Sequence, residues 1–174
     1  MLLLPLLPAG CAPGETPALP PPAAEKEDAT LPPAEAERQT VILYFADAQF
    51  DRLVREERQI ILAGREKAVA VLEELIEGPA YPAHGKTIPS DVKVLGVKIG
   101  GGIADADFSE ELYSSHWGGS AGESFTVYSI VNTLAELPGV EQVQIRIEGE
   151  IVETLVGHLV LSEPLSPDPG LVAP

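Results

Sequence analysis

Four carboxylates lie close together in the sequence: Asp105, Asp107, Glu110 and Glu111. Carboxylate oxygens are the ligands that Ca²⁺ prefers in proteins. The first two alternate with alanine along a predicted strand and the other two follow in the next loop, which is not the ligand spacing of a calcium-binding loop. We therefore interpret the cluster as a solvated strand face in an acidic protein, and we expect no metal ion and no other cofactor.

A second group contains the residue types of a serine hydrolase: Ser120, Ser124, Ser129, His116 and Asp107. A catalytic triad is defined by geometry, and this sequence has no nucleophile-elbow motif that would fix one. Ser120 is also expected to cap a helix. We therefore predict no catalytic residues, and an envelope hydrolase is the least favoured of the functions considered below.

The remaining candidate side chains are isolated in the sequence. His84 and His158 have no ligand-spaced neighbour, so we expect surface or structural roles for both. Trp117 is the only tryptophan and precedes Gly118 and Gly119 in a predicted loop. An aromatic side chain in such a loop suits contact with a ligand or partner. Packing on the core is the preferred interpretation, and Trp117 is kept as the one candidate binding residue.

Cys11 is the only cysteine, so no disulfide can form within the chain. Residues 1–8 are mostly leucine, and the sequence Leu-Pro-Ala-Gly precedes the cysteine. This arrangement resembles a bacterial lipobox, in which the cysteine is acylated and becomes the new N-terminus after cleavage. Pro8 stands where an aliphatic residue is usual and no Lys or Arg precedes the apolar run, so the true start codon is expected upstream. The alternative is an incidental cysteine in a short hydrophobic N-terminus.

The next segment, residues 12–39, contains seven prolines among Ala, Glu and Thr and has no apolar period. Such a composition predicts a disordered tether. Residues 165–174 are also rich in proline and predict a disordered tail. The expected organisation is a signal segment over 1–11, a tether over 12–39, one domain over 40–164 and the tail.

The charge of the chain limits the kinds of partner. It has 174 residues and a formal net charge of -16. Nucleic acid is excluded as a partner, because phosphate binding requires clustered Lys and Arg. Anionic lipid would also repel the protein. We therefore expect contact with a membrane only through a lipid anchor at Cys11.

The clearest elements of the domain are a helix and the strand that follows it. Ser120 and Glu123 have the spacing of a capping box, and Pro138 with Gly139 stops the helix. Apolar residues recur on one helical stripe, and apolar residues then alternate with polar ones along a strand. The stripe comprises Val127, Ile130, Val131, Leu134 and Leu137, and the buried strand face comprises Val143, Ile145 and Ile147.

Other patterns complete the fold. We predict a central strand buried on both faces at 40–46, an exposed strand at 53–61, strands at 92–99 and 103–108, and a last strand at 157–162. A further helix is predicted at 66–77, and residues 109–119 form an irregular loop. The order, roughly β-β-α-β-β-α-β, predicts an α+β fold with two helices on one face of a mixed or antiparallel sheet.

Several short motifs in this order resemble a GerM domain, the domain of a spore-germination and sporulation lipoprotein. The most specific is Leu72-Glu-Glu-Leu-Ile-Glu-Gly-Pro79, and the others are residues 41–45, 87–90, 107–109, 129–134, 143–149 and 157–158. The resemblance implies similarity to ring-building modules and no established catalytic residues. The sporulation protein has two such domains in tandem, and this sequence has one.

Three functions follow as expectations. The first is a non-catalytic domain tethered to the extracytoplasmic face of the cell membrane, which takes part in envelope protein assembly linked to sporulation or germination. Its partner would be an envelope or membrane protein, or further copies of the chain in a homo-oligomer or ring. The second is a module that binds cell-wall glycan or peptide through residues 109–119. The third is the hydrolase considered above.

Overall fold

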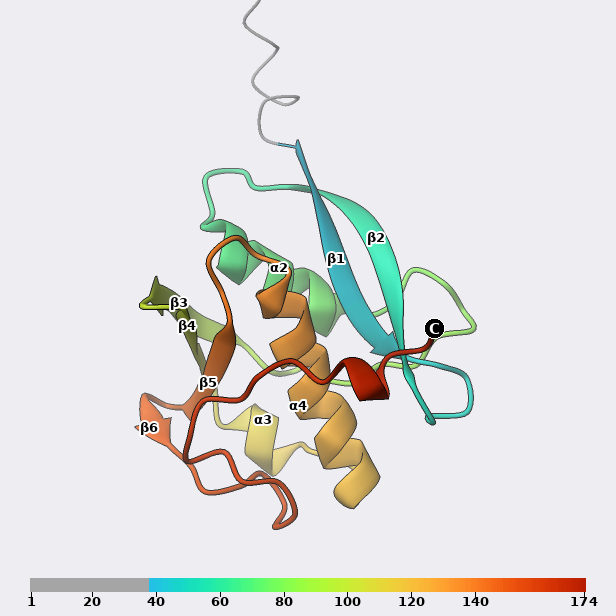
Figure 1. Ribbon diagram of the computed structural model, residues 1–174, viewed down its shortest axis with the longest axis vertical. Helices are drawn as coiled ribbons and strands as arrows, with labels where there is room; N and C mark the ends of the chain where they lie inside the picture. Colours follow the sequence, from blue (N-terminus) through green and yellow to red (C-terminus); the bar gives the residue numbers. More distant parts are fainter. Residues whose placement is uncertain (1–37) are drawn as a thin grey trace, which may run out of the picture. The chain divides into compact units, whose positions relative to one another are not determined.

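The first two strands form a hairpin that stands at one side of the molecule (Figure 1). The computed structural model describes residues 38–174. Cys11 and the predicted tether up to residue 37 lie outside the described residues. Strand β1 (Arg38–Ala46) begins two residues before the predicted start of the domain at residue 40 and pairs antiparallel with β2 (Leu53–Ile61) along its whole length.

The hairpin is a separate two-stranded sheet, so the prediction of one sheet with β1 at its centre was wrong. The free edge of β1 faces a helix, where the backbone N–H of Tyr44 donates to Thr133 Oγ1 at 3.1 Å. β1 is apolar because other elements cover both of its faces over its C-terminal half, where residues 43–46 are buried. The apolar sequence of β1 therefore predicts its burial correctly, but it does not predict which elements cover the strand.

The second sheet has four strands in the order β3-β4-β5-β6. These are β3 (Val94–Gly100), β4 (Ile103–Phe108), β5 (Gln142–Ile147) and β6 (Glu150–Ile151). β4 and β5 are parallel and the other pairs are antiparallel. The predicted inner face is confirmed, because Ala104, Ala106, Phe108, Val143 and Ile145 are buried toward the helices. The other face of β5 departs from the alternation at Gln144, which is buried too.

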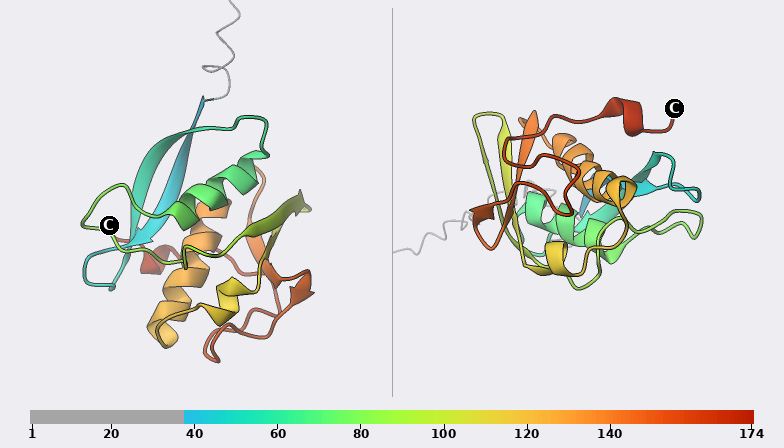
Figure 2. Two further views of the ribbon diagram at one scale, coloured as in Figure 1. Left: turned by 180° about the vertical axis from the view of Figure 1, so that it is seen from behind. Right: turned by 90° about the horizontal axis from the view of Figure 1, so that it is seen from below.

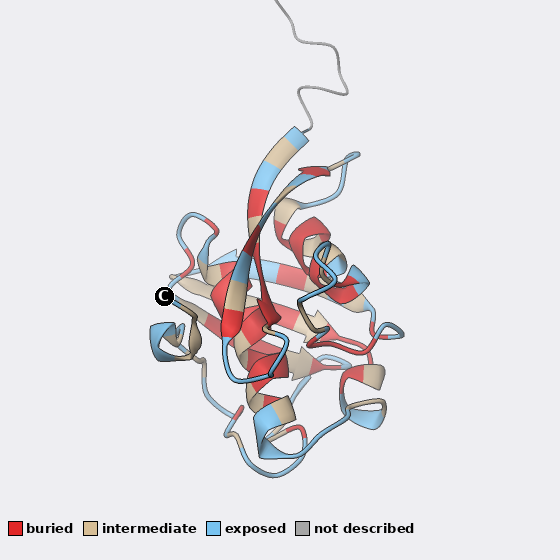
Figure 3. Cartoon of the chain, turned by 90° about the vertical axis from the view of Figure 1, so that its right-hand side faces the viewer, coloured by how far each residue is buried: buried red, intermediate tan, exposed pale blue. Residues whose placement is uncertain are grey.

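The two main helices lie between the hairpin and the four-stranded sheet (Figure 2). Helix α2 (Lys67–Glu77) contacts β1, β2 and β3, and helix α4 (Ser120–Ala135) contacts β1, β5 and α2. Both predicted apolar stripes are confirmed, and buried residues gather on these helices and on the strand faces toward them (Figure 3). The α+β class is therefore confirmed, with the strands divided between two sheets.

The structure also corrects three local predictions. Residues 109–119 contain a short helix, α3 (Glu111–Ser114). Residues 157–162 form no strand, and the last strand of the sheet is β6, which pairs with β5. The capping box is absent, because Gly119 is the N-cap of α4 and Ser120 is already the first helical residue, while the Glu123 side chain bonds elsewhere.

The C-terminal residues 165–174 are ordered against the domain, contrary to the predicted disorder. They cross α4 and end beside the hairpin (Figure 1), with a short 3-10 helix η1 (Pro169–Leu171). Leu165 pairs with Val143, and the N–H of Ala173 donates to the carbonyl of Leu53 at 2.8 Å. Leu171 and Val172 pack on a small apolar cluster, whose buried members are Tyr44, Ala46, Leu53 and Phe125. Backbone pairing and apolar contact thus order a segment whose composition alone predicted disorder.

Candidate interaction surface

The acidic cluster does not form a metal site in the described part of the chain. Asp105 Oδ1 pairs with Arg146 Nε at 2.6 Å, and Asp107 Oδ1 accepts the N–H of Gly149 at 2.8 Å. A hydrogen bond from Ser109 lowers the pKa of Glu111. Within residues 38–174 no group of three His, Cys, Asp or Glu side chains is placed to hold a metal ion. Both aspartates are therefore bonded to β5 or to the turn that follows it, on the outer face of the sheet.

The serine, histidine and aspartate residues do not assemble into a triad. His116 Nε2 lies 3.1 Å from Thr126 Oγ1, which donates in turn to the carbonyl of Thr87 at 2.6 Å. Burial lowers the pKa of His116. Ser129 is buried and donates to the carbonyl of Thr126, so its hydroxyl is not presented to a substrate. Among the described residues, no hydrogen bond joins His116 to a serine or to Asp107.

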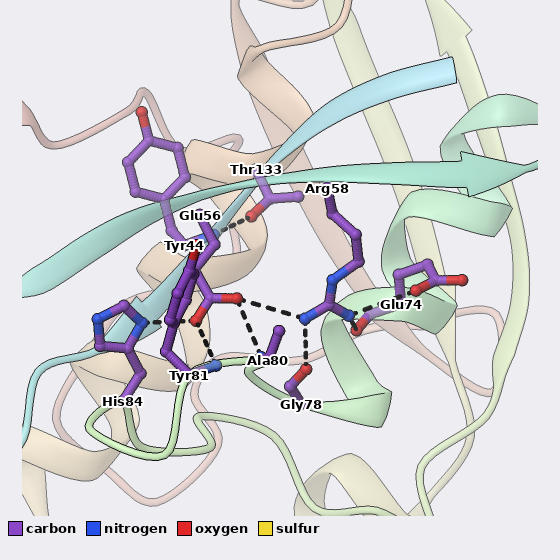
Figure 4. Close-up of polar contacts among 9 residues, drawn as sticks. All are labelled: Tyr44, Glu56, Arg58, Glu74, Gly78, Ala80, Tyr81, His84 and Thr133. Carbon is purple, nitrogen blue, oxygen red and sulfur yellow. Dashed lines mark hydrogen bonds and ion pairs between the residues drawn. The ribbon is translucent and has the colours of Figure 1, made fainter. Parts of the chain in front are cut away.

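A buried carboxylate on β2 fixes the loop that follows α2 (Figure 4). Glu56 Oε1 lies 2.5 Å from His84 Nδ1, and its Oε2 accepts the N–H of Ala80 at 3.0 Å. Both oxygens of a charged carboxylate are therefore used within the fold, where burial would otherwise be costly. His84, expected to be a surface or structural residue, has a structural role.

Arg58 completes this network from the same face of β2. Its guanidinium donates to the carbonyl of Gly78 at 2.8 Å, pairs with Glu74 Oε2 at 3.3 Å and lies 5.6 Å from the centre of the Phe45 ring. This network is not evident from the sequence, because residues 55–58 are all charged and predict an exposed strand. One feature of the sequence indicates that Glu56 and Arg58 point toward the core. Side chains alternate between the two faces of a strand, so both residues lie on the same face as Ile60, which is buried.

A second buried carboxylate, Glu123, fixes the loop at residues 154–159. Its side chain accepts one hydroxyl, from Thr154, and four backbone N–H groups, from Leu155, Val156, His158 and Leu159. Burial alone would raise the pKa of Glu123, but the hydrogen bonds from Thr154 and the loop amides outweigh it and lower the pKa. The residue is 0% exposed, so it serves the fold and cannot reach a ligand.

Asn132 and Thr133 interrupt the apolar surface of α4 because they bond to other segments. Asn132 donates to the carbonyl of Asp168 at 3.3 Å and accepts its N–H at 3.0 Å, so it holds the C-terminal residues against α4. Gln144, predicted to face solvent, is buried and donates to the carbonyl of Leu161 at 2.8 Å. The buried polar side chains named here therefore hold loops and termini in place.

Trp117 lies in the loop between α3 and α4 and is 46% exposed, so the preferred prediction of packing on the core was wrong. Its neighbour Gly118 adopts a φ of 92°, a conformation that favours glycine, which supports a tight turn beside the ring. Trp117 thus remains a candidate contact residue. His158 is also exposed, although its backbone is bound by Glu123.

The outer edge of β3 presents an apolar surface. Leu95 is 49% exposed and Ile99 is 47% exposed. A hollow of about 470 Å³ lies on one side of the strand, between Ile99, Ala68 of α2 and Pro138. Another of about 390 Å³ lies over the outer sheet face beside Leu95. Exposed apolar side chains beside the outer edge of an edge strand are typical of a protein contact surface.

Within residues 38–174, no helix has the length and apolar character needed to span a bilayer.

No curated protein matches the chain. Among solved structures, the tandem GerMN domains of the sporulation protein GerM from Bacillus subtilis match with a TM-score of 0.63 at 23% identity. That match covers 79% of this chain and 47% of the other, so this chain spans about half the length of the tandem protein.

Two further structures match most of their own length. The first GerMN domain of the same Bacillus subtilis protein has a TM-score of 0.58 at 28% identity, covering 74% of this chain and 97% of that one. A candidate lipoprotein from Clostridium perfringens has a TM-score of 0.54 at 23% identity, covering 83% and 99%. A family model described as "Germane: Sporulation and spore germination" matches residues 42–153. The chain therefore belongs to the Germane family of sporulation and spore germination domains.

Proposed function

We propose that this chain is a non-catalytic assembly module, held at the extracytoplasmic face of the cell membrane by a lipid on Cys11. The observation that carries the proposal is the outer edge of β3, which no strand within residues 38–174 covers and where Leu95 and Ile99 are exposed beside two hollows. The buried polar groups support it, because Glu56, Glu123 and Asn132 are all bonded within the fold. A partner envelope protein would dock on this edge in a process linked to sporulation or germination.

The anchor can be tested separately from the contact surface. The relative from Clostridium perfringens is described as a candidate lipoprotein, which agrees with the predicted acylation. The intact mass of the membrane-fraction protein should correspond to a chain that begins at Cys11 and carries acyl groups. Cys11→Ala should move the protein out of that fraction. An unmodified mass in the membrane fraction would contradict the proposed anchor.

The contact surface is tested by photocrosslinking in intact cells. A photoreactive residue at Ile99 should give a defined crosslinked product that contains an identified envelope protein or a second copy of this chain. The matched control is the same residue at Gln59, which is exposed on the outer face of β2, away from the β3 edge. Equal products from both positions, or none from Ile99, would contradict the proposal.

A second candidate function is binding of cell-wall glycan or peptide by the loop around Trp117. The exposure of the ring is the observation that favours it. Trp117→Ala should abolish sedimentation with a purified wall fraction, while Tyr113→Ala, another exposed aromatic nearby, should not. If the unaltered chain does not sediment with the wall fraction, this second function is excluded.

A further inference from the structure

The strand order places β3 and β6 at opposite edges of the same sheet, and these edges carry opposite charges. The β3 edge, defined here as Lys93, Leu95, Lys98 and Ile99, combines exposed apolar and basic side chains and contains no acidic residue. The β6 edge, defined as Glu150, Ile151 and Glu153, combines an isoleucine that is 44% exposed with two exposed carboxylates. Each edge thus offers the charge that the other lacks.

This contrast stands out against the charge of the rest of the domain. Beyond residue 67 the only basic residues are Lys86, Lys93, Lys98 and Arg146, so the β3 edge holds half of them. Arg146 is paired with Asp105. In the described part of the chain, no ion pair involves Lys93, Lys98, Glu150 or Glu153. All four side chains are exposed, so a partner can reach them, although Lys98 also lies opposite Asp105 in the register of β3 and β4.

We propose that the β3 edge of one copy of this chain docks against the β6 edge of a second copy, head to tail. The inference rests on the proposed assembly function and names a second copy as the partner. Leu95 and Ile99 would bury apolar surface against Ile151, and Lys93 and Lys98 would face Glu150 and Glu153. β6 has only two residues, so side chains rather than a long backbone ladder carry the contact.

The charges also decide against the symmetric alternative. Two β3 edges placed together would bring Lys98 of one copy toward Lys98 of the other, and two β6 edges would bring carboxylates together. When a β3 edge contacts a β6 edge, the resulting pair of chains still has one free edge of each kind, so further copies can add by the same contact. Such head-to-tail contacts generate a ring if the rotation closes and a filament if it does not.

The net charge of -16 opposes any self-association, so the contact in dilute solution is weak. Anchoring on one membrane would raise the effective concentration, as tethering does generally. The experiment therefore follows sedimentation of the full chain at low ionic strength up to about 1 mM, the effective concentration typical of short tethers. Three variants are compared: Lys93→Glu with Lys98→Glu, Glu150→Lys with Glu153→Lys, and all four changes together.

Each two-site variant should self-associate about tenfold more weakly than the parent, because attraction at the contact becomes repulsion. Association should return when the two variants are mixed, since each then offers the charge that the other needs. The four-site variant, with both edges reversed, should associate like the parent. Reversing the exposed hairpin charges, Arg55→Glu with Glu57→Lys, is the matched control and should change nothing.

A parent chain that stays monomeric at every concentration overturns the inference, and so does a four-site variant that fails to regain association. Recovery in the mixture also shows that both variants are folded. If Ile99 crosslinks to a different envelope protein while the chain stays monomeric, the head-to-tail contact is wrong and the assembly function stands. If Ile99 crosslinks to nothing in cells, the assembly function itself fails.

Discussion

Glu123, in the first turn of α4, accepts the backbone N–H of His158 at 2.9 Å, although the two residues are 35 positions apart. The same carboxylate binds the N–H groups of Leu155 and Val156 at 2.8 and 3.0 Å. One buried charge therefore replaces the backbone pairing that a strand would have given this segment. The loop after β6 depends on a helix that precedes it in the sequence.

Replacing this carboxylate should release the loop. Glu123→Gln leaves one acceptor oxygen and places an amide N–H₂ against groups that also donate, so the free energy of unfolding should fall by about 2–4 kcal/mol. Urea denaturation measures the loss, and amide hydrogen exchange should accelerate at residues 154–159. The neighbouring Ser124→Ala should have little effect. Unchanged exchange in the loop of the Glu123→Gln protein would show that the carboxylate does not hold it.

The pH dependence of stability should also report on Glu123. Its pKa in the folded protein lies below the ordinary value of 4.5, so the folded state favours the charged form. The stability that the carboxylate contributes is fully present above about pH 4.5, the pKa of the unfolded state, and is lost as the pH falls through the lower pKa of the folded state. Denaturation measured from pH 7 downward should show the parent losing stability more steeply in this acidic range than Glu123→Gln. Parallel curves would contradict the lowered pKa.

The elements with a strong period could be predicted from the sequence, and the segments fixed by distant partners could not. The stripes of α2 and α4 and the inner faces of β4 and β5 follow from local burial, because each of these elements turns one apolar face toward the core. The burial of Gln144 on the other face of β5 does not follow from the alternation. Glu123 was interpreted as a capping residue, since its spacing from Ser120 fits that role. Nothing local indicates that its partners lie at residues 154–159.

The same limit applies to the candidate interaction surface. The lysines of the β3 edge and the carboxylates of the β6 edge are visible in the sequence, but their meaning depends on strand order. The predicted strand at 157–162 does not form, and the strand that pairs with β5 is the two-residue β6. The proline-rich C-terminal residues gave no sign that Asn132 and Leu53 would bind them, because both partners lie far away in the sequence.

The Glu56 network gives a prediction with a closely matched control. Glu56→Gln should lower the free energy of unfolding by about 2–4 kcal/mol, because it removes a buried charge that Arg58 and the N–H of Ala80 require. Hydrogen exchange should accelerate at residues 80–85. Glu57→Gln changes the adjacent, exposed carboxylate and should leave stability within about 0.5 kcal/mol of the parent. Equal losses for the two variants would contradict a special role for Glu56.

The C-terminal segment should be released by a change on α4. Asn132→Ala removes both hydrogen bonds to the backbone of Asp168 and leaves its N–H and carbonyl to find water, which should cost about 1–3 kcal/mol. Because Leu171 and Val172 cover Tyr44 and Leu53, the freed segment should expose that apolar cluster and become sensitive to proteases beyond residue 164. Limited proteolysis with mass analysis locates the cuts. The control is Gln59→Ala, which changes an exposed amide on β2. If the C-terminus is equally resistant in both variants, the apolar contacts and the hydrogen bond between Ala173 and Leu53 hold the segment without Asn132.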